Sequence, residues 1–403
     1  MIFSPDIMIS ALSILAGVSV LSYILVLIFK RLALDAGVVD TPRNDRFHAE
    51  PVPLLGGNAI YMAFLLGLMI RGMVDIWEAL LMFSGVIFQL YGIARHPRRV
   101  YLFFVIAAIW CTIGGIIVAD GDGADQVLGL LIGGTILLLV GNVDDARGGV
   151  IPHVKLVGQL IAGFFLIYFG ISVAFFTDIA THWGMPWLIW LAYPFTLFWI
   201  IGLTNAFNLI DNMNGLSCGV AVTSSFFFGL ISFVNGQFDL GFIFFILAGA
   251  GVGYLPHNFP RARIFMGDSG SLFTGFIIAG LSIVGSWGTA AGVPGGGLKL
   301  SLAIPMLVLI YPIFDVSLVT ITRVIRRRPI SLGGKDHSSH RLVRMGLKPT
   351  DAVLLIYAFS SFTGFCALFL TMIGYEQAIL MLAFNFLFIF LVGLRLARIE
   401  TDE

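Results

Sequence analysis

Residues 126–147 read QVLGLLIGGTILLLVGNVDDAR, a long apolar run that ends in two adjacent aspartates and an arginine. A membrane-spanning helix needs about 20 predominantly apolar residues, so the run predicts a helix over 126–142. Carboxylates are costly in or near hydrocarbon unless they are paired, solvated or bound to a cation. Asp144 and Asp145 are therefore expected at a membrane surface, as a solvated helix end or as part of a cation site.

The composition supports a membrane protein. Of the 403 residues, 58% are hydrophobic and only 11% are charged, whereas soluble proteins carry about 25% charged residues. The net charge is zero, which argues against nucleic acid as a partner. The three cysteines lie in or beside apolar runs without metal-type spacing, so neither a disulfide framework nor a cysteine metal site is expected.

The apolar runs predict an all-α, polytopic membrane bundle of about 11–13 transmembrane helices. No basic residue precedes Lys30, so the first run is expected to be a retained helix and not a signal peptide. The second to fifth runs leave open one re-entrant pair in place of two full spans. The expected helices cover residues 7–29, 56–72, 77–93, 100–119, 126–142, 156–176, 187–205, 217–235, 239–256, 270–287, 299–321, 352–373 and 376–395.

Charge asymmetry orients these helices. If the loops alternate between sides, one side holds 21 of the 23 lysines and arginines, and the other holds only Arg71 and Lys299. The basic side is expected to be cytoplasmic, which places the N-terminus outside and the C-terminus inside. Residues 1–403 then form a single membrane-embedded domain, with cytoplasmic loops over 30–55, 143–155, 206–216, 257–269 and 322–351.

Two further polar stretches fall on this expected cytoplasmic side. In TNAFNLIDNMNGLSCG, residues 204–219, Asn205, Asn208 and Asp211 recur every three residues and share a helix face. Their donors and acceptors suit a nucleobase or ribose; the alternative is a polar cap followed by a turn. In NFPRARIFMGDSGS, residues 258–271, Asp268 lies in a glycine-rich turn that suits an anion or Mg²⁺, with an ordinary helix cap as the alternative.

Basic and titratable residues complete the set. His337, His340, Arg341 and Arg344 follow helical spacing within KDHSSHRLVRMG and could grip a pyrophosphate; anchoring to anionic lipid is the alternative for this loop. Lys155 could hold a phosphate or anchor a helix at the interface. Further candidates are Asp315, an acid inside an expected helix, and the basic first loop with Arg43, Arg46 and His48.

The motifs GNVDD, NAFNLID, NFPRARIFMGDSGS and H..HR, in this order, resemble the polyprenyl-phosphate N-acetylhexosamine-1-phosphate transferases. The similarity runs from Asp40 to about Gly346. The motif pattern of this chain resembles the surface-glycan branch of the family more than the phospho-N-acetylmuramoyl-pentapeptide branch. The resemblance implies transfer of a sugar-1-phosphate from a UDP-sugar to a polyprenyl phosphate, with release of UMP. It also implies Mg²⁺, with Mn²⁺ as a substitute, at the cytoplasmic face of the plasma membrane; a homodimer is left open.

The resemblance also implies roles for individual residues. Asp268 and Asp145 match metal-binding acids, and Asp144, Asp145, Asp268 and His337 match the catalytic set. The positions that match substrate contacts are Lys155, Asn205, Asn208, Asp211, Asn258, His340 and Arg341, with Arg46 and His48 added from the first loop.

The chain departs from the family pattern in four places. Asn212 stands where the family usually has Gly, Asn214 where it has Asp, and Ser339 where it often has the middle His of the histidine motif. The region between Gly57 and Asp144 is long enough for an additional helical hairpin.

Other functions remain open at this stage. A transporter could use the carboxylates as ion or proton relays, although transport sites usually lie near the middle of the bilayer. A phospho-N-acetylmuramoyl-pentapeptide transferase would use the same kind of site. A CDP-alcohol phosphotransferase is disfavoured because its Asp-Gly-x-x-Ala-Arg motif is missing.

Overall fold

The computed structural model describes residues 5–41, 51–118, 126–150, 152–285, 287, 302–329 and 334–399. These residues are almost wholly helical, which confirms the all-α prediction. The helices are α1 (Pro5–Ala36), α2 (Gly56–Ile70), α3 (Ile76–Arg95), α4 (Val100–Val118), α5 (Gln126–Arg147), α6 (Pro152–Tyr168), α7 (Phe175–Trp183), α8 (Ala192–Leu209), α9 (Leu216–Val234), α10 (Phe238–Asn258), α11 (Gly267–Val284), α12 (Ala303–Val308), α13 (Ile310–Ile325), α14 (Ser338–Arg344), α15 (Pro349–Leu370) and α16 (Tyr375–Ala397).

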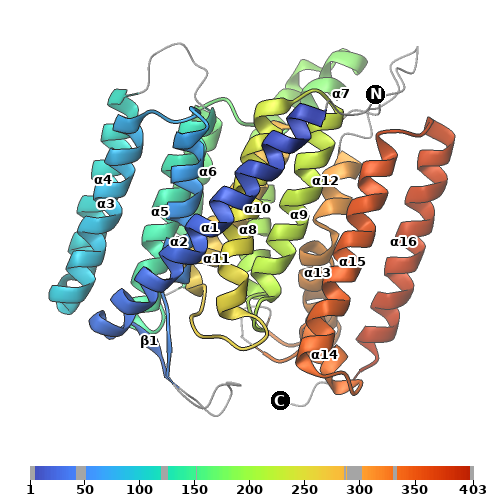
Figure 1. Cartoon of the computed structure of the whole chain (residues 1–403). Coiled ribbons are helices and arrows are strands. Elements are labelled where there is room, and N and C mark those ends of the chain that lie inside the picture. Colours follow the sequence, from blue (N-terminus) through green and yellow to red (C-terminus); the bar gives the residue numbers. More distant parts are fainter. Residues whose placement is uncertain are drawn as a thin grey trace.

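Short elements connect some of the helices. The 3-10 turns η1 (Pro97–Arg99) and η2 (Pro186–Leu191) precede α4 and α8. The strands β1 (Val39–Asp40) and β2 (Val52–Pro53) form an antiparallel ribbon with Val39 opposite Pro53. Because β1 follows α1 and β2 precedes α2, the ribbon lies at the lower end of the bundle (Figure 1).

Each expected membrane helix has a counterpart in the structure. Ten helices of the described residues are long and apolar enough to cross a membrane, and α2 and α6 are shorter apolar helices. The protein is therefore a multi-pass membrane protein. Two short helices, α7 and α14, were not predicted. α5 also continues past the expected end at residue 142 to Arg147, so both of its aspartates lie in its last turn.

The bundle has a buried centre and lipid-facing edges. Of the residues in the apolar, span-length part of α5, 89% are buried inside the protein, whereas in α16 the share is 11%. α3 and α4 form an outer hairpin at one edge and α16 lies at the opposite edge, with α5, α10 and α11 between them (Figure 1). Both helices of the hairpin are long enough to cross a membrane, which favours two full spans over a re-entrant pair.

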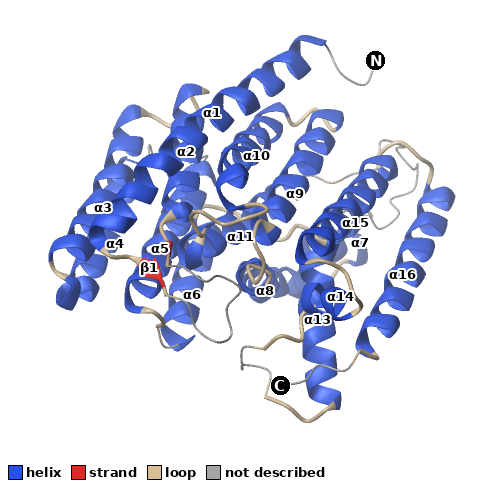
Figure 2. Cartoon of the chain, turned by 60° about the horizontal axis from the view of Figure 1, so that its bottom comes forward, coloured by secondary structure: helices blue, strands red, loops and turns tan. Residues whose placement is uncertain are grey.

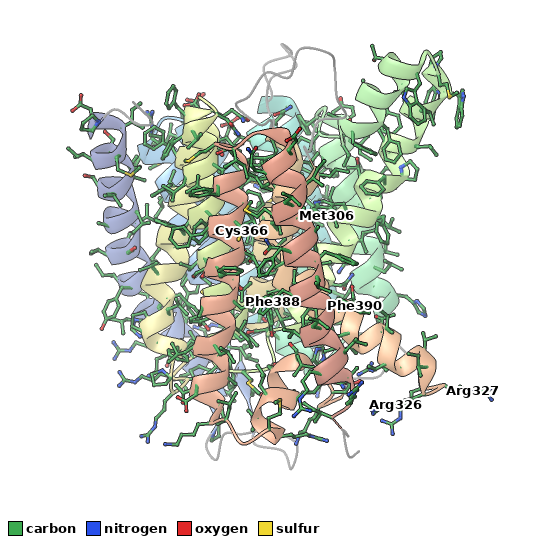
Figure 3. The ribbon with its side chains drawn as sticks, turned by 90° about the vertical axis from the view of Figure 1, so that its right-hand side faces the viewer. Met306, Arg326, Arg327, Cys366, Phe388 and Phe390 are labelled. Atoms are coloured by element: carbon green, nitrogen blue, oxygen red, sulfur yellow. The ribbon has the colours of Figure 1, made fainter. Side chains whose placement is uncertain are left out.

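The expected helix over 299–321 is divided by prolines. Pro312 has no N–H to donate to the carbonyl of Val308, and that carbonyl instead accepts a hydrogen bond from Ser224 Oγ at 3.2 Å. The chain therefore breaks between α12 and α13. α13 leans away from the bundle toward its lower end, where Arg327 points outward (Figure 3) and Arg326 Nη2 donates to the carbonyl of Ala397 at the end of α16, at 3.5 Å.

Glycines let the backbones of α2, α5 and α11 approach closely at the lower end of the bundle. A Cβ atom on Gly57 would lie 2.1 Å from the nitrogen of Gly270. A Cβ atom on Gly141 would lie 2.3 Å from the nitrogen of Ser269. Only glycine fits both contacts, so these positions fix how near the last turn of α5 comes to the first turn of α11.

We predict that Gly141→Ala lowers the stability of the protein by about 1–3 kcal/mol, because the added methyl group would overpack against the backbone of α11. Gly202→Ala on α8 is the matched control, since nothing lies within 4 Å of a Cβ atom at that position. Thermal unfolding in detergent measures both. Equal melting temperatures for the two variants would contradict the close approach.

Candidate active site

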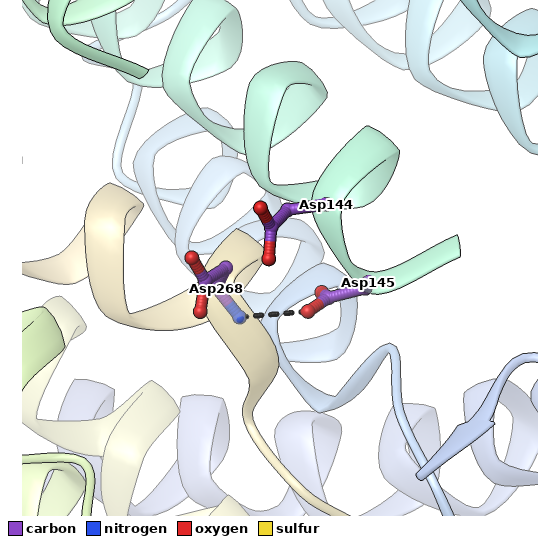
Figure 4. Close-up of side chains that lie close together, drawn as sticks. All are labelled: Asp144, Asp145 and Asp268. Atoms are coloured by element: carbon purple, nitrogen blue, oxygen red, sulfur yellow. Dashed lines mark hydrogen bonds between the residues drawn. The ribbon is translucent and has the colours of Figure 1, made fainter. Parts of the chain in front are cut away.

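Three carboxylates meet where α5 ends and α11 begins. Asp144 and Asp145 come from the last turn of α5, and Asp268 comes from the first turn of α11 (Figure 4). One ligand atom from each carboxylate lies within 4.8 Å of the others. The sequence separates Asp145 from Asp268 by more than a hundred residues, and the expected convergence of the acids is observed. Carboxylate oxygens in this arrangement suit a hard divalent cation.

Asp145 binds the N-terminus of α11. Its Oδ1 accepts a hydrogen bond from the backbone nitrogen of Asp268 at 2.8 Å, and its Oδ2 accepts from Ser269 Oγ at 2.8 Å and Ser269 N at 3.2 Å. The first N–H groups of a helix have no partner within the helix and carry partial positive charge. Asp145 thus supplies from α5 the cap that α11 lacks, and Gly267, at φ 71°, makes room for it.

Lys155, in the first turns of α6, lies between the other two acids. Its Nζ is 2.9 Å from Asp144 Oδ1 and also donates to Asp268 Oδ2. With all three acids ionised, one ammonium leaves two negative charges uncompensated, which equals the charge of one divalent ion. Among the described residues, Asp144 Oδ2 and Asp268 Oδ1 have no hydrogen-bond partner, so each acid keeps an oxygen for a ligand.

A buried amide network lies behind the acids, and the sequence interpretation missed it. Asn58 and Asn142 exchange side-chain hydrogen bonds of 2.7 and 3.1 Å, and Asn142 Nδ2 also donates to Gln89 Oε1 at 3.0 Å. All three side chains are buried. The network ties α2 and the outer hairpin to α5 less than one turn from Asp144. The pattern in the sequence that could have predicted this network is the presence of three amides within apolar runs.

Of the polar face expected over Asn205, Asn208 and Asp211, the two amides lie on α8 and contact neighbouring helices, whereas Asp211 lies in the turn after α8, which ends at Leu209. Asn205 exchanges hydrogen bonds of 2.9 and 3.0 Å with Gln159 on α6. Asn208 Nδ2 donates to Ser271 Oγ on α11 at 2.8 Å, three residues after Asp268. These residues therefore join α8 to the helices that carry Lys155 and Asp268.

Asn258, expected at the substrate, fixes the turn between α8 and α9. Its Oδ1 accepts a hydrogen bond from the nitrogen of Gly215, and its Nδ2 donates to the carbonyl of Ile264 at 2.9 Å. The side chain is buried. Both ends of the amide are thus used by the backbone, so the structure gives Asn258 a bracing position.

Asp315 holds the start of α14 as Asp145 holds the start of α11. Its Oδ2 lies 2.7 Å from His337 Nδ1, and its Oδ1 accepts from the nitrogen of Ser338 at 2.7 Å and from the Ser338 hydroxyl. Asp315 is wholly buried. The intramembrane acid is therefore the partner that orients the His337 imidazole.

Arg341 was expected to contact a phosphate, but its side chain is turned into the protein. Its side chain is wholly buried, with Nε donating to the carbonyl of Asp336 at 2.7 Å, Nη1 to that of Leu396 at 2.9 Å and Nη2 to Thr322 Oγ1 at 3.1 Å. The guanidinium thus ties α14 to α13 and α16. Helical spacing did align Arg341 with His337, but the contacts with α13 and α16 turn it inward.

Asp336 and His340, which lie close to His337 in the sequence, have shifted pKa values. Burial opposes ionisation of Asp336, but its ion pair with Arg323, with a distance of 2.7 Å between Nη2 and Oδ1, lowers the pKa of the carboxyl below its usual value. Burial, together with the nearby His337 and Lys335, lowers the pKa of His340 to about 4. His340 is therefore neutral at pH 7. Arg46 and His48 lie outside the described residues.

Hydrogen bonds gather the polar loops at one end of the bundle, which comes forward in Figure 2. Gly56 N and Gly57 N donate to the carbonyls of Phe265 and Met266, at 3.0 and 2.9 Å, so the first loop meets the segment before α11. The turn after α8 meets α14 through Ser339 Oγ and Asn212 Oδ1 at 2.8 Å. The sequence motifs thus share one surface.

Comparisons with known proteins show similarity to membrane sugar-phosphate transferases. Residues 127–286 match the family model Glycosyl transferase family 4. The chain is 29% identical over 336 residues to the probable undecaprenyl-phosphate N-acetylglucosaminyl 1-phosphate transferase of Bacillus subtilis, a match that covers 82% of this chain and 76% of that protein. It is 27% identical over 350 residues to the decaprenyl-phosphate N-acetylglucosaminephosphotransferase of Mycolicibacterium smegmatis, covering 83% and 76%.

A shorter match, 36% identical over 150 residues, is to the phospho-N-acetylmuramoyl-pentapeptide-transferase of Listeria monocytogenes and covers 35% of this chain and 44% of that protein. Fold, site and matches together define a multi-pass membrane transferase. Residues 127–286 thus resemble glycosyl transferase family 4, and the resemblance to polyprenyl-phosphate sugar-phosphate transferases drawn from the sequence motifs is confirmed.

We predict that Asp145→Asn lowers the stability of the ligand-free protein by about 1–3 kcal/mol, because an amide nitrogen would face the donors of α11 and leave one unpaired. Asp144→Asn is the control on the same turn: its remaining oxygen can still accept from the nitrogen of Val150, as Asp144 Oδ1 does at 2.7 Å. Thermal unfolding in detergent compares them. A larger loss for Asp144→Asn would contradict the capping role of Asp145.

Proposed function

We propose that the protein transfers an N-acetylhexosamine-1-phosphate, with N-acetylglucosamine-1-phosphate as the first candidate, from a UDP-sugar to a polyprenyl phosphate of the undecaprenyl type. The products are a polyprenyl-diphospho-sugar and UMP, and the reaction would initiate a cell-surface glycan. The observation that carries the proposal is the cluster of Asp144, Asp268 and Lys155 at one end of a membrane bundle. Relatives named for this reaction match most of the chain.

The reaction joins two anions. An oxygen of the lipid phosphate attacks the β-phosphorus of the UDP-sugar, the bond from that phosphorus to the bridging oxygen breaks, and UMP leaves with the bridging oxygen. Catalysis of such a transfer depends on positioning and on neutralising charge. A phosphate monoester has a second pKa near 6, so the lipid phosphate is mostly a dianion at pH 7 and carries little proton to remove.

The donor set fits Mg²⁺, an ion that prefers carboxylate, water and phosphate oxygens. We assign Asp268 and Asp144 to hold it, since each has an unpaired oxygen among the described residues. The bound ion would neutralise charge on the pyrophosphate. Asp145, expected from the sequence as a ligand or base, has both oxygens engaged by α11 and is assigned to position Asp268.

Other residues are assigned to the substrates. Lys155 would leave the two acids and contact a phosphate oxygen when a divalent cation takes its place. His337, with Nδ1 on Asp315, keeps Nε2 for the sugar-phosphate. Asn208 on α8 and Asp211 in the turn after it would contact the nucleotide.

The membrane arrangement supports a reaction at the cytoplasmic face of the plasma membrane. Basic residues in the described parts of these loops, such as Arg147 at the end of α5 and Arg263 shortly before α11, lie at the same end of the bundle as the acids, and such loops are cytoplasmic in most membrane proteins. The polyprenyl tail would remain in the bilayer while the UDP-sugar approaches from water. A site at helix ends also favours this proposal over a transporter, whose site would lie near mid-membrane.

We predict that Asp268→Asn lowers the rate of Mg²⁺-dependent UMP release by at least about 100-fold, the usual scale for removing a group that stabilises charge in the transition state. The assay uses purified protein, polyprenyl phosphate and a panel of UDP-N-acetyl sugars, including UDP-N-acetylmuramoyl-pentapeptide, with lipid product detected by mass.

Asp351→Asn is the control, an exposed acid in the first turn of α15, and it should retain wild-type activity. Wild-type rates in Asp268→Asn would contradict the assignment of Asp268. A wild-type protein that forms no lipid-linked product with any donor would contradict the proposed function.

A further inference from the structure

Two loops assigned to different parts of the donor meet at a partly buried hydrogen bond. Ser339 Oγ in the first turn of α14 donates to Asn212 Oδ1 in the turn after α8, at 2.8 Å. Ser339 is wholly buried. The Nδ2 of Asn212 donates to the carbonyl of Leu209 at 2.9 Å, so the amide is oriented with its oxygen toward α14.

Each of these loops is already fixed to its own side of the site. Asp315 on α13 holds the start of α14 through His337 and Ser338. Asn258 at the end of α10 holds the turn after α8 through Gly215. The hydrogen bond between Asn212 and Ser339 therefore joins two segments that are anchored separately, the turn after α8 and the start of α14. Its length helps to set the distance between these two segments.

The neighbours of this pair are the residues assigned to the substrates. Asn212 follows Asp211 on the nucleotide side, and Ser339 lies between His337 and His340 on the sugar-phosphate side. We propose that Asn212 and Ser339 are positioning residues that set the separation of these two sides for the UDP-sugar. This inference rests on the proposed function, and it concerns donor binding alone.

The two positions are also sterically linked. An imidazole at 339 extends well beyond the position of Oγ, which is already at hydrogen-bond distance from the Asn212 side chain. Removal of that side chain would open the space. Replacing Asn212 by glycine and Ser339 by histidine together should therefore be tolerated better than either replacement alone.

The experiment is a double-mutant cycle on the full-length protein with N212G, S339H and N212G/S339H, and with S339A and S339T as further variants. Each single exchange is expected to raise the KM for the UDP-sugar roughly three- to tenfold, the scale of one lost neutral hydrogen bond. The KM for polyprenyl phosphate should stay unchanged. The double exchange should recover most of the loss, and S339T, which keeps a hydroxyl, should stay near wild type.

The outcomes separate the possibilities. Additive losses in the double exchange, or equal changes in the KM for donor and lipid, would overturn the positioning role. If S339H does not fold, S339A and S339T decide: equal donor KM values for these two would overturn it as well. Absence of UMP release from the wild-type protein would instead defeat the proposed function.

Discussion

The site depends on one carboxylate that caps a helix other than its own. Asp145 ends α5 and binds the first backbone N–H groups of α11. A cap of this kind needs two helices in near contact, and Gly141 permits the approach because any side chain there would meet the backbone of Ser269. Asp268 is thereby held opposite Asp144, and Lys155 lies between them.

The same arrangement recurs at the other side of the site. Asp315, on α13, binds the nitrogen of Ser338 and the imidazole of His337 and so fixes α14. In both cases an acid on a membrane helix is stabilised by the N-terminus of another helix, where partial positive charge favours a carboxylate. Ordered polar groups are thus built at the end of the bundle from membrane helices and short connecting segments.

The sequence predicted the helices and the convergence of the acids because both follow from strong local signals. Runs of about 20 apolar residues mark spans, and the distribution of lysine and arginine sorts the loops between two sides. The roles of individual side chains were less accessible. Arg341 shares helical spacing with His337, yet its donors bind Thr322 and the carbonyl of Leu396, contacts that spacing along one helix cannot specify.

The amide network of Asn58, Gln89 and Asn142 escaped prediction for the same reason, since each amide lies in a different apolar run. The break between α12 and α13 was also missed, although Pro305 and Pro312 were visible in the sequence. The run over 299–321 is long enough for one membrane span, so a single helix was expected despite the two prolines.

Binding of Mn²⁺ to the purified protein tests the central claim most directly, with the electron paramagnetic resonance signal of the free ion as the readout. The wild-type protein should bind one ion per chain that Mg²⁺ displaces, Asp268→Asn should lose this binding, and Lys155→Met should bind at least as tightly because the competing ammonium is gone. Equal stoichiometry and affinity in the wild type and Asp268→Asn would contradict a cation site between α5 and α11.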